Sequence, residues 1–163
     1  MHKTYFTEVA EYNLFAANIA CSWLEKISNE HWNAPVASSF GNIQKTVLHI
    51  FFAENIWIER FNENENIVPL EKTFQGTKQE HIALWKKSSE ELKNFITSFD
   101  KIKLNETFTF KRFNGEETSS KYYRAFAHVI NHSTYHRGQL VLMLKQLGYG
   151  NFQSTDLITF YRK

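Results

Sequence analysis

The chain has 163 residues, of which 42% are hydrophobic and 16% aromatic, so it can bury a complete core as one domain over residues 1–163. Its 19 basic and 17 acidic side chains give a net charge of +2 and form no basic stripe, which argues against nucleic-acid binding. The single cysteine, Cys21, excludes an internal disulfide, and no leader segment or membrane-spanning run of about 18 apolar residues is present. We therefore expect a cytoplasmic protein that does not contact membranes, with Cys21 in its core.

The first part of the chain predicts two long helices. Residues 4–28 carry apolar side chains at every third or fourth position, which is the pattern of an amphipathic helix. Residues 29–39 contain a proline and several serines and asparagines, and predict a loop. Ser39 or Asn42 can cap a second helix over about residues 43–61, which is apolar on nearly all sides and is therefore expected to be buried.

A third helix and a hairpin are predicted next. Residues 62–76 are polar and form the longest connection. Thr77 can cap the third helix, and Glu80, three positions later, completes the pattern of a capping box. Strand-forming residues on both sides of an Asn-Gly pair in residues 104–118 predict a short β-hairpin or an extended insertion.

A fourth helix is expected to start near Ser119 or Ser120 and to end at about Leu147, where Gly148 supplies a stop. The tail, residues 151–163, is apolar enough that we expect it to pack back on the helices. Four long helices, with the short β-hairpin or extended insertion before the last of them, predict an all-α protein with the architecture of a four-helix bundle.

The fourth predicted helix carries three of the seven histidines, His128, His132 and His136, at positions i, i+4 and i+8. Residues four apart lie on one face of a helix, so such rings can converge on a single ion. The helical period places this face toward the core, where imidazoles need hydrogen-bond partners or a metal ion. Neighbouring carbonyl groups or water could satisfy each ring separately, but the regular spacing favours a metal site.

A further ligand is expected from another helix. His49 is the candidate because its helical neighbours are apolar, which predicts a buried position on the second helix. His31 in the predicted loop, His81 in a polar stretch and His2 at the terminus are expected to be solvated. Three neutral imidazoles suit Zn²⁺, with Ni²⁺ as a second choice, and leave one coordination position open for water or substrate, as in catalytic sites.

Several motifs resemble those of one known family. The segment from His132 through His136 to Gln139 has the form HxxxHRGQ, the signature of the DinB/YfiT-like family of metal-binding four-helix bundles, and Asn131 extends it to NHxxxHRGQ. The segments around Asn13 and His49 and the closing DLxxFY motif are similar to other motifs of that family. The resemblance covers nearly the whole chain and implies the same fold.

The resemblance also implies site residues. His49, His132 and His136 correspond to the three metal ligands, which leaves His128 to pack in the core or to hydrogen-bond to a ligand. Gln139 lies on the same helical face as His132 and is expected to contact whatever the metal binds.

Other residues of these motifs are expected to act around the ligands. Asn13 and Asn131 can orient ligands through hydrogen bonds, or can equally take surface or capping roles. Arg137 is rotated away from the histidines and is expected in a salt bridge or at an interface.

Three functions are consistent with this pattern. The protein resembles the thiol-transferase branch of the family, in which the metal holds a low-molecular-weight thiol, and also members named as metal-dependent hydrolases. Glu54 is the nearest candidate for the general base of a hydrolase, but at i+5 from His49 it points away, which favours thiol chemistry. A non-catalytic, stress-related metal-binding protein is the third possibility. Catalytic residues and the substrate are not defined by the sequence, and a homodimer is expected by analogy with the family.

Overall fold

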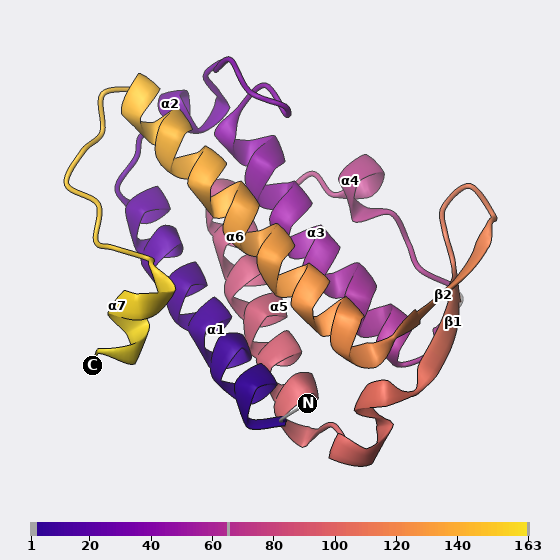
Figure 1. Cartoon of the computed structure of the whole chain (residues 1–163). Helices are drawn as coiled ribbons and strands as arrows, with labels where there is room; N and C mark the ends of the chain where they lie inside the picture. Colours follow the sequence, from indigo (N-terminus) through magenta and orange to yellow (C-terminus); the bar gives the residue numbers. More distant parts are fainter. Residues whose placement is uncertain (1–2, 65, 163) are drawn as a thin grey trace.

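The computed structural model describes residues 3–64 and 66–162. Its body consists of four long helices, α1 (Lys3–Glu25), α3 (Ile43–Phe61), α5 (Lys78–Ser98) and α6 (Tyr122–Gln146) (Figure 1). Helices α1 and α3 each pack against both α5 and α6, so the four helices surround a common core. The predicted four-helix bundle is confirmed.

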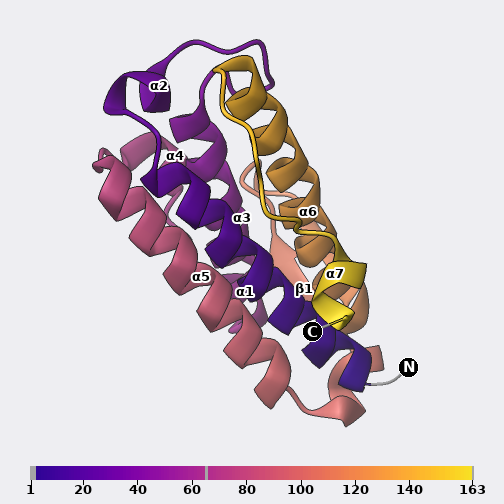
Figure 2. The same cartoon turned by 90° about the vertical axis from the view of Figure 1, so that its left-hand side faces the viewer.

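Shorter elements connect or cover these helices. They are α2 (Asn29–Asn33), α4 (Leu70–Thr73), the 3-10 helix η1 (Lys101–Asn105), β1 (Thr107–Lys111), β2 (Glu117–Lys121) and α7 (Leu157–Tyr161). The tail packs back on the bundle as expected, and Figure 2 shows α7 beside α1. The Tyr12 hydroxyl donates to the Thr155 carbonyl at 2.8 Å, and the ring of Phe160 lies 6.0 Å from that of Tyr12.

Two predicted helix starts are confirmed by their caps. The Asn42 side chain accepts a hydrogen bond from the Lys45 amide at 2.9 Å, so Asn42 rather than Ser39 begins α3. Thr77 and Glu80 form the predicted reciprocal capping box at the start of α5. Both caps satisfy amide groups that the first turn of a helix leaves without partners.

Two stretches predicted as connections contain short helices. The Ser28 hydroxyl accepts from the His31 amide at 3.1 Å and begins α2, whose Trp32 is only 2% exposed. Burial of this indole holds the turn against the core, which a loop prediction from local composition cannot foresee. The polar connection 62–76 likewise contains α4.

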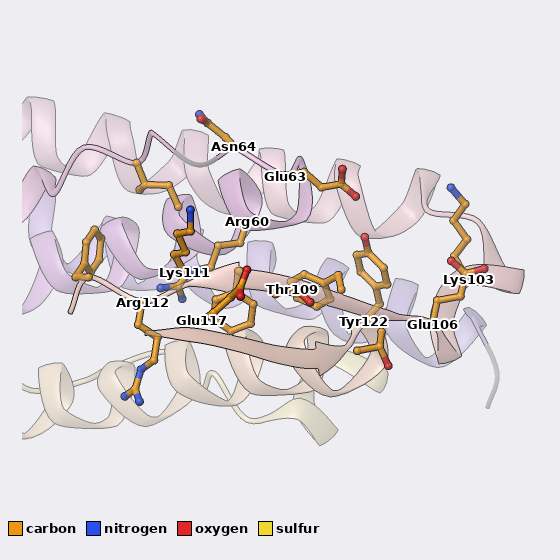
Figure 3. Close-up of a pocket in the computed structure, with 15 residues that line it drawn as sticks. Arg60, Glu63, Asn64, Lys103, Glu106, Thr109, Lys111, Arg112, Glu117 and Tyr122 are labelled. Atoms are coloured by element: carbon orange, nitrogen blue, oxygen red, sulfur yellow. The ribbon is translucent and has the colours of Figure 1, made fainter. Parts of the chain in front are cut away.

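The predicted hairpin is present, and β1 pairs with β2 in antiparallel register, Thr107 opposite Lys121 and Lys111 opposite Glu117. Because β2 includes Ser119 and Ser120, neither serine caps α6, and the predicted helix start was two or three residues early. The ring of Phe108 stacks on Tyr122 at 4.5 Å, which favours the strand pairing over an earlier helix start. A hollow of about 560 Å³ lies between the hairpin and the end of α3 (Figure 3).

The core has two apolar clusters, one at each end of the bundle. The first contains Trp23, Ile50 and Trp85, and the second contains Phe61 and Phe126 together with further aromatic rings. The heavy aromatic content thus serves packing between helices. Cys21 is fully buried and unpaired, and burial raises the pKa of its thiol to about 12.

A buried polar layer separates these two clusters. The Glu54 carboxylate on α3 is fully buried and accepts four hydrogen bonds of 2.7–2.9 Å, from Asn13 on α1, Ser88 and Ser89 on α5, and Ser133 on α6. A carboxylate can accept all four, so each of these four buried side chains has a partner for a donor.

The same layer contains a cation. Arg137 on α6 is 1% exposed and donates from Nη1 to Asn13 Oδ1 at 2.6 Å, while Asn13 Nδ2 donates to Glu54. The two partners settle the orientation of the Asn13 amide, because Arg137 can only donate. Asn13 therefore links a buried anion to a buried cation.

No helix in residues 3–64 and 66–162 combines the length and the hydrophobicity that crossing a membrane requires.

Replacing Glu54 tests the importance of this layer. Glu54→Ala removes the common acceptor of four buried donors and the counter-charge of Arg137, and we expect the free energy of unfolding to fall by about 3–5 kcal/mol. Urea unfolding followed by circular dichroism measures the change. Glu90→Ala, at an exposed position on α5, is the control and should change stability by less than about 0.5 kcal/mol. Equal effects of the two substitutions would contradict a structural role for the layer.

Candidate metal centre

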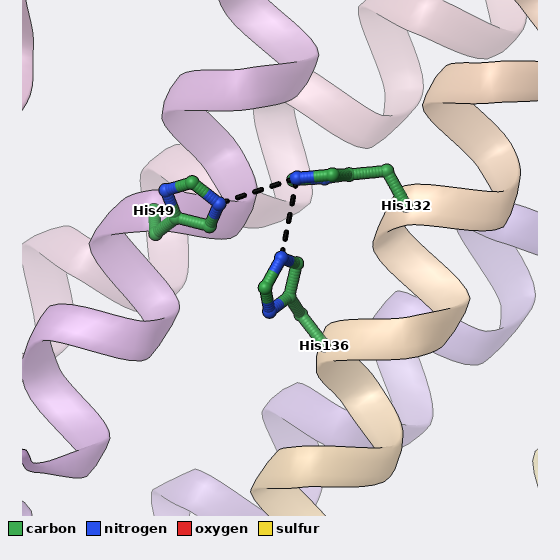
Figure 4. Close-up of side chains that lie close together, drawn as sticks. All are labelled: His49, His132 and His136. Atoms are coloured by element: carbon green, nitrogen blue, oxygen red, sulfur yellow. Dashed lines mark hydrogen bonds between the residues drawn. The ribbon is translucent and has the colours of Figure 1, made fainter. Parts of the chain in front are cut away.

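Three imidazoles from two helices converge between α3 and α6 (Figure 4). Nε2 of His132 lies 3.2 Å from Nε2 of His49 and 3.2 Å from Nε2 of His136. One ligand atom from each ring falls within 4.8 Å of the others. Two nitrogens bound to one tetrahedral Zn²⁺ at 2.0–2.1 Å are about 3.3 Å apart, so the observed spacing is that of ligands sharing an ion.

The backbone brings these rings together in two ways. His132 and His136 are one helical turn apart on α6, so they project toward α3 from adjacent turns. Ser133, next to His132, donates to Glu54 on α3 at 2.8 Å and so fixes the position of α6 along α3. His49 is half-buried, with 25% of its side chain exposed, rather than fully buried as predicted.

The outward-facing nitrogens of two rings have acceptor partners. Nδ1 of His49 lies 2.6 Å from a carboxylate oxygen of Glu71 on α4, and Nδ1 of His136 lies 2.8 Å from Oε1 of Gln139. Because both oxygens accept, each Nδ1 donates, and in the neutral ring this leaves a lone pair on Nε2 that faces the centre. Oxygen partners of this kind orient metal-binding histidines and raise their basicity.

Burial favours the neutral form of two of the three rings. Burial, with smaller contributions from the neighbouring His136 and His49, lowers the pKa of His132 to about 4. Burial also lowers the pKa of His136, although the hydrogen bond that His136 donates to Gln139 opposes this shift. Nδ1 of His132 is buried without a hydrogen-bond partner. If His49 and His136 are neutral with their protons on Nδ1, only His132 can place a proton among the three Nε2 atoms. One proton cannot serve both short contacts well, whereas a cation would satisfy all three lone pairs.

Phe40, in the loop before α3, covers part of the cluster. Its ring stacks on His49 at 4.4 Å and meets His136 edge-on at 5.5 Å. Neither Phe40 nor Glu71 was predicted as a site residue. Both lie in irregular segments whose contacts depend on the folded arrangement, and no local pattern in the sequence identifies them.

The structure separates the other predicted residues from the cluster or gives them different roles. His128 is exposed rather than in the core, with its ring 5.3 Å from that of Trp57 and 5.8 Å from that of His132. Each step of four residues rotates a helical position by about 40°, which carries His128 to the edge of the bundle. Asn131 is exposed and hydrogen-bonds to none of the three histidines.

Three further residues make contacts that the sequence did not specify: Gln139, Asn13 and Arg137. Oε1 of Gln139 accepts from Nδ1 of His136, which orients that ring, and the predicted contact of Gln139 with a metal-bound molecule stays a prediction. Asn13 belongs to the buried layer and reaches the histidines only through Glu54 and Ser133. Arg137 is rotated away as predicted, but it is buried in the core and not at an interface.

Glu54 points away from the ligands, as its position in the helix indicated, and its role in the buried layer was missed. Mid-helix polar residues at matching depths in all four helices were the available signal for that layer.

Among the other histidines, Nδ1 of His31 lies 2.8 Å from the Tyr149 hydroxyl. His81 is 1% exposed and lies among aromatic rings, so the prediction that it is solvated was wrong.

Comparisons with known proteins agree with the fold. The sequence profile of the DinB family matches residues 1–160. Protein DinB from Bacillus subtilis (strain 168) is 26% identical over 148 residues, which cover 86% of this chain and 85% of that protein. The crystal structure of a DinB-like protein, YjoA, from Bacillus subtilis has a TM-score of 0.67 at 15% identity and covers 91% of this chain and 97% of that one. At that identity the structural likeness concerns the fold alone.

The contact between Glu71 and His49 predicts a measurable contribution to metal affinity. Glu71→Gln keeps an acceptor oxygen but removes the negative charge, and we expect the affinity for Zn²⁺ to fall about 10- to 100-fold. Isothermal titration calorimetry of metal-stripped protein measures this affinity. Glu90→Gln removes an equal charge from an exposed position on α5 and should leave the affinity unchanged. Identical affinities for the two variants would show that Glu71 does not support the site.

Proposed function

The chain belongs to the DinB family, and on that premise we propose that it is a metal-dependent enzyme that transfers a low-molecular-weight thiol to an electrophile. In this proposal His49, His132 and His136 hold one divalent ion, Zn²⁺ as first choice and Ni²⁺ as second. The observation that carries the proposal is the convergence of three Nε2 atoms, with two contacts of 3.2 Å between them.

The donor set suits a catalytic ion. Three neutral imidazoles leave one of four tetrahedral positions open, which distinguishes catalytic from structural zinc sites. A divalent ion in such a site lowers the pKa of a bound thiol or water. The protein groups around the ligands hold the rings in place: Glu71 accepts from His49, Gln139 accepts from His136, and Phe40 stacks on His49.

The surroundings of the histidines favour a thiol over water as the nucleophile. Hydrolysis calls for a general base; the carboxylate nearest to His49 along α3 is that of Glu54, and Glu71 contacts His49 from α4. Glu54 is buried and accepts four hydrogen bonds, and Glu71 is engaged with His49 at 2.6 Å. A thiol, with an ordinary pKa of about 8.5, needs less help to ionise than water does.

The expected partners follow from the same proposal. The substrate is a small molecule that reaches the open position, and a cavity of about 500 Å³ lies beside His49 and Glu71. The homodimer and the cytoplasmic location expected from the sequence stay predictions.

Metal binding is the first test. We expect metal-stripped protein to take up one Zn²⁺ per chain, and His132→Ala to lower the affinity at least 100-fold because it removes the ring that contacts both others. Titration calorimetry and elemental analysis after dialysis measure affinity and stoichiometry. His128→Ala removes an exposed histidine one turn earlier on α6 and should keep full binding. Equal losses in both variants would reject the three-histidine site.

Turnover is the second test. Zinc-loaded protein should accelerate the reaction of a cellular thiol with monobromobimane, and His132→Ala should abolish the acceleration while His128→Ala retains it. A parallel panel of activated esters measures hydrolysis. Ester turnover without thiol transfer would favour a hydrolase, and stoichiometric zinc with no turnover in either panel would favour a non-catalytic metal-binding protein. Either outcome would reject thiol transfer.

A further inference from the structure

The cavity beside His49 has a definite chemical character. Its volume is about 500 Å³. Helix α3 forms one wall, α4 contributes Glu71, and the hairpin loop closes the opposite side. The lining residues are His49, Phe52, Ala53, Ile56, Arg60, Glu71, Arg112, Phe113 and Asn114.

The α3 wall is a single stripe along the helix. His49, Phe52, Ile56 and Arg60 stand at i, i+3, i+7 and i+11, positions that share one helical face. A separation of eleven residues corresponds to a rise of about 16 Å. The cavity thus extends from a candidate metal ligand, over apolar side chains, to a guanidinium group.

Arg60 is held in place but lacks an anionic partner. Its guanidinium carbon lies 5.0 Å from the ring centroid of Trp57 and 4.5 Å from that of Phe110. Such contacts orient the planar group, but they do not replace hydrogen-bond acceptors. Nε of Arg60 is buried without a partner, and no carboxylate pairs with Arg60 within residues 3–64 and 66–162. A half-buried cation with unused donors therefore lines the cavity.

The hairpin adds a second cation and an apolar rim. Arg112 lines the cavity and pairs with Glu116 at 3.0 Å. Burial lowers the pKa of Arg60, and the positive charge of the nearby Arg112 lowers it as well. Phe113 is 57% exposed and stacks on Phe52 with ring centroids 6.0 Å apart. An exposed phenyl group over an apolar floor can cover a bound ligand.

The other hollow, of about 560 Å³, helps to decide what the first one binds (Figure 3). It shares Arg60, Arg112 and Phe113 with the cavity beside His49, but none of the three histidines lines it. Glu63, Glu106 and Glu117 line it as well, whereas the carboxylate that lines the cavity beside His49, that of Glu71, already contacts Nδ1 of His49 at 2.6 Å. In the cavity beside His49, Arg60 therefore faces no carboxylate that lacks a partner.

We propose that this cavity binds a small-molecule substrate carrying a carboxylate, in an extended form that reaches from the histidine cluster to Arg60. The carboxylate pairs with the Arg60 guanidinium, the apolar part lies on Phe52 and Ile56, and Phe113 covers it. Only the placement of a reacting thiol at the histidine end rests on the proposed function. The recognition of the anionic end depends on the cavity alone.

Octanoate is the first probe because it has a carboxylate and an apolar chain but no thiol. It should bind, with or without Zn²⁺, in a manner that depends on Arg60. Arg60→Gln should lower its affinity about 10- to 100-fold, the range expected for losing a hydrogen-bonded charge partner. Arg112→Gln, at an exposed position, should give a smaller loss without risk to folding.

Lys103→Gln is the matched control, since it removes a positive charge from the other hollow only, and it should leave octanoate binding unchanged. Titration calorimetry measures all affinities, and circular dichroism checks that each variant is folded. Octanoate binding that is absent, or equally strong in folded Arg60→Gln and the parent protein, would overturn the proposal.

Two thiols separate this proposal from the proposed function. Mercapto-octanoic acid should bind zinc-loaded protein more tightly than mercapto-octanol, and Arg60→Gln should remove most of that difference while leaving the alcohol unaffected. An equal affinity for acid and alcohol would overturn the anionic site. If octanoate binding depends on Arg60 but the thiol adds no affinity in zinc-loaded protein, the carboxylate site stands and thiol binding at the metal fails.

Discussion

The buried Glu54 carboxylate is the constraint on which the geometry of the bundle depends. It accepts hydrogen bonds from each of the other three long helices, and Asn13 connects it to the buried guanidinium of Arg137. Along every helix these polar residues stand between the two apolar clusters. Apolar contacts alone tolerate small sliding of one helix along another, but a buried charge loses its partners when a helix slides. The layer therefore specifies one alignment of the four helices.

The same alignment sets the histidine cluster. Ser133, which bonds to Glu54, lies between His132 and His136 in the sequence, and its side chain points into the core while theirs point along the α3 surface. A shift of α6 by one turn would move both rings by about 5.4 Å relative to His49, which is more than the spacing between their nitrogens. The polar interior thus helps to set the geometry of the histidine cluster through the position of α6.

These relationships explain what the sequence could predict. The four long helices, the hairpin and the pairing of His49 with His132 and His136 follow from periodicity, capping residues and motifs, which are local patterns. Glu71 was not predicted because its contact joins residues 22 apart through a short turn in a polar stretch. The sequence correctly predicted that Glu54 points away from His49. Its role as a buried acceptor was not predicted, because that role depends on donors from three other helices. His128 shows the limit of periodicity, because a helical face that is buried at one turn reaches the edge of the bundle at another.

One face of α3 carries two groups that call for binding partners of opposite charge. At His49, three imidazole lone pairs converge where a cation would be stabilised, and at Arg60, a guanidinium group lacks an anion. The polar layer inside the bundle supplies neither partner, because its anion, Glu54, is linked through Asn13 to its own cation, Arg137. Binding a cation at the histidines adds positive charge to a face that already carries Arg60 and Arg112, which increases its attraction for an anion. A ligand with a metal-binding group at one end and a carboxylate at the other would satisfy both ends of the stripe, and each interaction would strengthen the other.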